Sequence, residues 1–184
     1  MNALILEPQP RLRILVRSER RRLDECEICG ARLKIEREDI SHILDGRLQK
    51  FEMLAKYFEM LQELINDVKA AKIDLGEFKA RYNRIMALYR ELDFVVSFGP
   101  KQGRIFCQRC GNPIPVTVDV AVDHKIEGEL KLDYLLRLQA PEDLNWFFKC
   151  ESGKTWDQLR EEAVNDPRRK AEIRELLKEA GIFF

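Results

Sequence analysis

The chain has 184 residues, of which 45% are hydrophobic and 35% are charged, and this composition suits a globular protein with long solvent-facing helices. Its 32 basic residues balance its 32 acidic residues. The balance excludes a protein that coats nucleic acid through overall charge, so any nucleic-acid contact must come from a local patch. No stretch approaches about 18 consecutive apolar residues and no signal peptide is recognisable, so we expect no membrane partner.

The N-terminal part is expected to form a short strand over residues 12–16. The densest basic run of the chain follows, and it consists of Arg17, Arg20, Arg21 and Arg22. Two interpretations of this run stay open. It is either a solvated approach to the cysteines that follow or a patch through which the chain contacts phosphate groups of nucleic acid.

The middle of the chain has the periodicity of helices. Apolar side chains recur at steps of three and four over residues 44–68, which predicts a long amphipathic helix. A second such helix follows over residues 75–92, and Asp74 with Glu77 forms an N-terminal capping pair for it. Two helices joined by a short turn predict an antiparallel hairpin, whose surface is a candidate for binding a protein partner or for self-association.

The remaining elements are predicted from local signals. Residues 94–98 favour a strand and residues 99–103 a turn, and valines alternate with polar or small residues up to Val122, which predicts a half-buried strand. Helices are expected at residues 132–138 and 156–164, with a third beginning at Asp166-Pro167 and capped by Gly181. Both tryptophans are expected in the core, and residues 182–184 are expected to dock on an apolar surface.

Together these elements predict an α+β fold that is mostly helical. We expect a small zinc-knuckle β core formed by residues 1–43 and 94–155, an inserted helical hairpin at residues 44–93, and C-terminal helices at residues 156–184.

Five cysteines carry the strongest chemical signal. Four of them form two C-x-x-C-G motifs, which we call the first knuckle (residues 26–30) and the second knuckle (residues 107–111). An odd cysteine count with paired spacing argues against a secreted disulfide framework and favours a reducing, cytoplasmic compartment. Two knuckles, each closed by a glycine, predict a structural zinc ion held by Cys26, Cys29, Cys107 and Cys110.

A second metal arrangement stays open. Each knuckle is followed by a histidine, His42 or His124, in a similar apolar-x-His-x-apolar-acidic-Gly-x-Leu context. This pattern suggests an internal repeat in which each knuckle recruits its own histidine, with Cys150 as an additional ligand of the second site. One shared four-cysteine site is favoured, because the first copy has no obvious fourth ligand.

Residues 107–155 resemble the phage-type HNH (His-Me finger) endonucleases. The similarity consists of the second knuckle, the strand that ends at Asp123-His124, and the closing helix segment from Glu142 through Cys150 to Thr155. The resemblance implies that His124 is the general base, that Asp123 helps to hold a catalytic Mg²⁺ or Mn²⁺ ion, and that Asn145 orients either the histidine or the backbone. The chain departs from the family pattern because Cys150 alone remains of the closing knuckle.

Three hypotheses of function follow. The first is a zinc-stabilised nucleic-acid-associated protein, either an HNH-like endonuclease or a degenerate relative without activity. The second is a non-catalytic zinc-ribbon protein that binds a protein partner, such as a nucleic-acid-processing machine, through its helical hairpin. The third is a structural protein that assembles through the hairpin.

Overall fold

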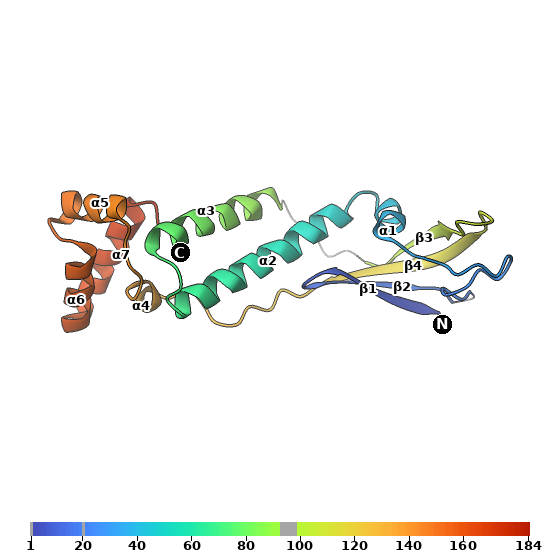
Figure 1. The fold of residues 1–184 in the computed structure, drawn as a ribbon, viewed down its shortest axis with the longest axis horizontal. Coiled ribbons are helices and arrows are strands. Elements are labelled where there is room, and N and C mark those ends of the chain that lie inside the picture. Colours follow the sequence, from blue (N-terminus) through green and yellow to red (C-terminus); the bar gives the residue numbers. More distant parts are fainter. Residues whose placement is uncertain (1, 20, 93–98) are drawn as a thin grey trace. The chain divides into compact units, whose positions relative to one another are not determined.

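The computed structural model describes residues 2–19, 21–92 and 99–184, and it has the α+β fold with predominant helix that the sequence predicts. The chain forms two compact units, Met1–Glu59 with Leu88–Lys125 and Met60–Ala87 with Ile126–Phe184. The boundary between them crosses the two long helices of the chain (Figure 1). Within the described ranges, no helix is both long enough and apolar enough to cross a membrane.

These two units do not coincide with the three parts predicted from the sequence. Residues 126–155, expected in the β core, lie in the second unit. The predicted division into three parts stays a prediction. The expected strand at residues 94–98 lies outside the described residues.

The first unit is built on a four-stranded antiparallel sheet with the strand order β1-β2-β4-β3. Its elements are β1 (Ala3–Gln9), β2 (Leu12–Arg17), α1 (Arg37–Ile43), the start of α2 (Leu48–Lys69), the end of α3 (Leu75–Glu91), β3 (Lys101–Phe106) and β4 (Pro113–Val122). The predicted strands correspond to β2 and β4, whose alternating side chains are buried on one face of the sheet.

The core of the first unit lies on that face of the sheet. Apolar side chains of β2, β3 and β4 pack there against α1 and the first turns of α2. A close approach of helix and sheet lies at Gly103 on β3, where a Cβ atom would lie 2.7 Å from Cγ2 of Ile43 on α1. The turn predicted over residues 99–103 is wrong for Lys101, Gln102 and Gly103, which belong to β3, because glycine here serves helix–sheet packing.

The apolar periodicity that begins at Leu44 predicts one continuous helix, but the structure has a turn near its start. Helix α1 ends at Ile43 and α2 begins only at Leu48. Between them, Asp45 and Gly46 have φ angles of 53° and 75°, which no α-helix accommodates. The chain therefore turns at this point, while Leu44 and Leu48 both remain in the core.

The regular secondary structure of the second unit is helical in the described residues. Its elements are the end of α2, most of α3, α4 (Leu132–Leu135), α5 (Glu142–Ser152), α6 (Trp156–Asn165), the 3₁₀ turn η1 (Pro167–Arg169) and α7 (Lys170–Glu179). The turn between α2 and α3 confirms the predicted hairpin, and the Asp74 side chain caps α3 by accepting the N–H of Glu77 at 2.8 Å. An ion pair of 2.7 Å between Arg81 and Asp67 connects the two helices near the turn.

The two tryptophans differ in environment. Trp156 is buried, stacks on Phe148 with ring centroids 5.2 Å apart, and donates its indole N–H to the carbonyl of Leu138 at 2.7 Å. Trp146 is 69% exposed, so its predicted place in the core is wrong. Both tryptophans lie on amphipathic helices. Apolar periodicity alone does not indicate which of the two side chains is buried.

The C-terminal signals are confirmed in part. The helix predicted over residues 132–138 is shorter, because α4 ends at Leu135. The Asp166 side chain accepts the N–H of Arg168, as expected for a helix start at Asp166-Pro167, and Gly181 has a φ angle of 84°. Of the last three residues, Ile182 is buried and the Phe184 ring meets the Phe78 ring edge-on, whereas Phe183 is exposed.

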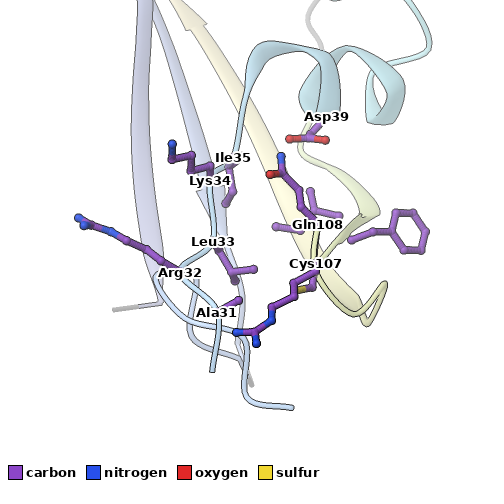
Figure 2. Close-up of a pocket in the computed structure, with 11 residues that line it drawn as sticks. Ala31, Arg32, Leu33, Lys34, Ile35, Asp39, Cys107 and Gln108 are labelled. Atoms are coloured by element: carbon purple, nitrogen blue, oxygen red, sulfur yellow. The ribbon is translucent and has the colours of Figure 1, made fainter. Parts of the chain in front are cut away.

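Beside the knuckles, the first unit contains a pocket of about 250 Å³. One wall is the extended segment that leads from the first knuckle toward α1, with Leu33 and Ile35 facing inward, and the other contains Cys107 and Gln108 (Figure 2).

Candidate metal centre

The first knuckle is a tight turn in the irregular segment between β2 and α1. Within it, the N–H of Cys26 donates to the carbonyl of Ala31 at 2.8 Å, and the N–H of Gly30 donates to the carbonyl of Cys26 at 2.9 Å. Gly30 has a φ angle of 72°, a conformation that favours glycine. The turn buries the sulfur-bearing Cys26 almost completely, at 2% exposure.

The second knuckle connects β3 to β4 and repeats the same backbone pattern. The N–H of Cys107 donates to the carbonyl of Asn112 at 3.0 Å, and the N–H of Gly111 donates to the carbonyl of Cys107 at 2.8 Å. Gly111 has a φ angle of 75°. The two knuckles are therefore the same local structure built twice, which explains why both motifs end in glycine.

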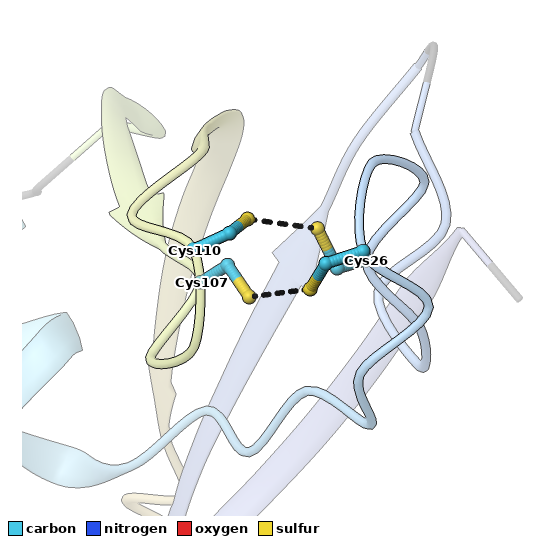
Figure 3. Close-up of side chains that lie close together, drawn as sticks. Cys26, Cys107 and Cys110 are labelled. Atoms are coloured by element: carbon cyan, nitrogen blue, oxygen red, sulfur yellow. Dashed lines mark hydrogen bonds between the residues drawn. The ribbon is translucent and has the colours of Figure 1, made fainter.

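The four knuckle sulfurs form one cluster. The Sγ atoms of Cys26 and Cys110 lie 3.6 Å apart, as do those of Cys29 and Cys107 (Figure 3). All four Sγ atoms lie within 4.8 Å of one another. Each first cysteine of one knuckle thus faces the second cysteine of the other, in a pseudo-symmetric arrangement.

These distances fit a metal ion and not a disulfide. A disulfide requires sulfurs about 2.05 Å apart. A tetrahedral zinc ion with Zn–S bonds of about 2.3 Å places its sulfur ligands roughly 3.8 Å apart. The observed spacing is close to the second value, so the four cysteines can hold one metal ion.

The electrostatics of the cluster differ between its members. Backbone N–H groups of Cys110 and Arg109 point at the Cys107 sulfur and lower its pKa to about 6. The N–H groups of Cys29 and Ile28 lower the pKa of Cys26 in the same way. For Cys110, the N–H of Asn112 lowers the pKa, but desolvation and the neighbouring thiols outweigh it and raise the pKa to about 12. A bound cation would stabilise all the thiolates.

The remaining candidate ligands lie elsewhere. Neither His42, exposed on α1, nor His124, exposed after β4, belongs to the cluster, and Cys150 is exposed on α5 in the second unit. The arrangement with one histidine for each knuckle is therefore not observed among the described residues. The similarity of the two halves ends with the knuckles, because a helix follows the first and a strand follows the second.

The basic run is divided by the structure. Arg21 forms an ion pair with Glu27 at 2.7 Å, and Arg22 forms one with Asp24 at 2.8 Å. Both partners are acids of the first knuckle or its approach. Arg20 lies outside the described residues, and Arg17 is exposed at the end of β2. As a result, Arg17 is the member of the run that is presented to solvent without a described partner.

Asp123 and His124 lie together where β4 ends. The Asp123 carboxylate accepts the N–H of Lys125 at 3.0 Å, and Arg11 donates to the carbonyl oxygens of Asp123 and Lys125 at 3.1 and 2.6 Å. The His124 ring lies 6.1 Å from the Phe58 ring, with Nδ1 3.2 Å from the carbonyl of Val122. If Nδ1 donates to that carbonyl, Nε2 is left as the free base.

Asn145 belongs to the second unit, on α5. Its side-chain oxygen accepts the N–H of Trp156 at 2.8 Å, at the first residue of α6. This bond satisfies one of the free N–H groups at a helix start, so Asn145 has a structural partner in its own unit. The structure therefore unites the four cysteines, leaves Asp123 and His124 as neighbours at the end of β4, and gives Asn145 a hydrogen bond within the second unit.

Comparison of the chain with protein-family models, with curated proteins and with solved structures found no match.

Proposed function

We propose that this protein is a zinc-stabilised, nucleic-acid-associated protein. The observation that carries the proposal is the cluster of four knuckle sulfurs within 4.8 Å of one another, contributed by segments 78 to 84 residues apart in the chain. One zinc ion at this cluster would hold the approach to α1 against the end of the sheet. Zinc knuckles stabilise small β units that cannot build a large core.

The nucleic-acid part of the proposal is supported by the surface of the first unit. A neutral chain needs local cations for this purpose, and Arg17 is exposed at the end of β2, the strand that leads to the first knuckle. Metal analysis and binding assays test the two parts separately. We expect about one zinc per chain in protein purified without chelator, and a shift of labelled DNA or RNA that is lost in high salt.

Hydrolytic activity is a second candidate function, and one observation favours it. Nδ1 of His124 lies beside a backbone carbonyl, and this arrangement leaves Nε2 available to activate a water molecule next to the exposed Asp123. In this candidate, Asp123 would help to hold Mg²⁺ or Mn²⁺. The His124→Ala protein should then retain its zinc and lose cleavage of DNA in the presence of either ion.

Two results would decide against this second candidate. If the parent protein does not cleave DNA or RNA with Mg²⁺ or Mn²⁺, binding without catalysis is the function to pursue. If His124→Ala loses zinc together with activity, the loss reports folding and not a catalytic base. Phe58→Leu serves as a control, because it removes the ring that contacts His124 and leaves the histidine in place.

A further inference from the structure

The two faces of the sheet in the first unit have different surroundings. One face is the core described above, and the side chains of the other face alternate with it along each strand. On β3 this alternation exposes Arg104 and Phe106 on either side of the buried Ile105. This second face of the sheet is therefore not covered by a hydrophobic core among the described residues of its own unit.

The part of this face nearest the knuckles carries two cations. Arg17 on β2 is paired with Thr117 on β4, and Arg104 on β3 is paired with Pro115 on β4. From strand spacing and residue rise, their Cα atoms are roughly 12 Å apart. Among the described residues, neither arginine has a side-chain hydrogen bond or ion pair.

An exposed aromatic ring and polar groups accompany these cations. Phe106 follows Arg104 at the next position on the same face and is 56% exposed. Gln102 and Thr117 are cross-strand partners on this face. Around Arg17 and Arg104, the surface forms a depression of about 560 Å³. We call Arg17, Gln102, Arg104, Phe106, Pro115 and Thr117 the knuckle-side face.

Three acidic side chains lie on or near the same face of the sheet. Asp119 is paired with Leu15, one step beyond the knuckle-side face, and Glu7 is engaged with Arg13 at 3.3 Å. Glu19 is the acid that lines the depression, and it belongs to the segment after β2. The knuckle-side face itself therefore contains two cations and no acid, and Asp119 and Glu19 lie at its edges.

We propose that the knuckle-side face binds single-stranded nucleic acid, an inference that rests on the proposed function and assigns its site. Arg17 and Arg104 would contact phosphates, and Phe106 would stack on an unpaired base. The major groove of a duplex admits a helix or a two-stranded ribbon but not a broad sheet face, whereas unstacked bases offer flat π-faces to an exposed ring. Two cations and one aromatic side chain form a small stacking platform of this kind.

The test is fluorescence anisotropy of labelled single-stranded DNA, single-stranded RNA and the matching DNA duplex with the full chain. Phe106→Ala should weaken single-strand binding by about 5- to 150-fold, the range for loss of one stacked base. Arg17→Ala and Arg104→Ala should each weaken it and lower the slope of log affinity against log salt by about 0.7. Zinc content and melting temperature should equal those of the parent, because all three side chains are exposed.

Two matched controls separate the face from general effects. Arg22→Ala removes a cation of the same basic run that is already paired with Asp24, and Trp146→Ala removes an exposed ring of the second unit. Neither should change binding. The inference is overturned if the controls weaken binding as much as the three face variants, or if the duplex binds more tightly than the single strand.

The outcomes distinguish this inference from the function on which it rests. If nucleic acid binds and all three face variants bind like the parent, only the assignment of the face fails. If neither single strands nor duplex bind at low salt to zinc-loaded protein, the nucleic-acid association itself fails. Capture of an acidic protein that competes at Arg17 and Arg104, without nucleic-acid binding, would likewise overturn both.

Discussion

The Sγ atoms of Cys26 and Cys110 lie 3.6 Å apart although the residues are 84 positions apart in the chain. Cys26 belongs to the loop after β2, and Cys110 to the turn between β3 and β4. Because β2 and β4 are neighbours in the sheet, their pairing brings both knuckles to one end of it. A metal at this point would close long chain segments, which is where a cross-link restricts the unfolded chain most.

Replacing one sulfur of the cluster should therefore remove the metal. We expect Cys110→Ser to reduce zinc from about one per chain to well below one, because three thiolates leave a structural zinc site open. The matched control is Cys150→Ser, which changes the exposed cysteine of α5 outside the cluster. Metal analysis by mass spectrometry is the measurement. Equal zinc in both variants, or about two zinc ions in the parent, would contradict a single four-cysteine site.

Zinc affinity should rise with pH. Near pH 7 the Cys107 thiol, with its pKa of about 6, has already lost its proton, whereas Cys110, with a pKa of about 12, still holds one. Zinc displaces that proton, so apparent affinity should increase about tenfold per pH unit for each proton released. As the pH falls through the pKa of Cys107, the proton on that thiol must be displaced as well, and the dependence should steepen.

This pH dependence is measured by competition with a chromophoric chelator whose own proton binding is calibrated. The direction follows from proton release, since a group that binds metal only as thiolate favours the bound state at high pH. Constant affinity over about two pH units around neutrality would show that the thiols are not the ligands.

The sequence specifies the metal site better than it specifies the sheet around it. The knuckles can be predicted from the sequence because a thiolate pair and a glycine with positive φ need fixed positions within five residues. Strand β3 could not be predicted in the same way. Gly103 is required by its contact with Ile43, and no local sequence pattern reveals a contact between residues 60 positions apart. Strand β1 is an edge strand with no fully buried side chain, so it has no strong periodicity.

The candidate catalytic residues show the same limit. The order of Asp123, His124 and Asn145 in the chain suggests one site, but order does not reveal hydrogen bonding. Asn145 caps α6 through the N–H of Trp156, a contact made across the turn between α5 and α6. Arg104 was missed because a single arginine in a strand is an ordinary solvent-exposed residue until the register places it beside Arg17.

Asn145→Ala should lower stability without touching the metal. It removes the acceptor for the N–H of Trp156, and loss of a helix-start acceptor costs about 1 kcal/mol of unfolding free energy. Zinc content should be unchanged, because the cluster lies in the first unit. Asn145→Asp is the matched control, since its carboxylate still accepts the bond. Denaturant unfolding measures both variants, and an alanine variant as stable as the parent would argue against the capping role.

Gly103→Ala should destabilise the first unit through packing. The added Cβ would lie 2.7 Å from Cγ2 and 2.8 Å from Cγ1 of Ile43, so α1 or β3 must shift. Overpacking of this kind costs about 1–3 kcal/mol. Gly99→Ala is the control, because a Cβ there meets nothing within 4 Å. In thermal unfolding, the first variant should melt well below the second. If Ile43→Ala restores the stability of Gly103→Ala in a double mutant, the steric contact is the cause; additive losses would instead point to an effect of alanine on the strand itself.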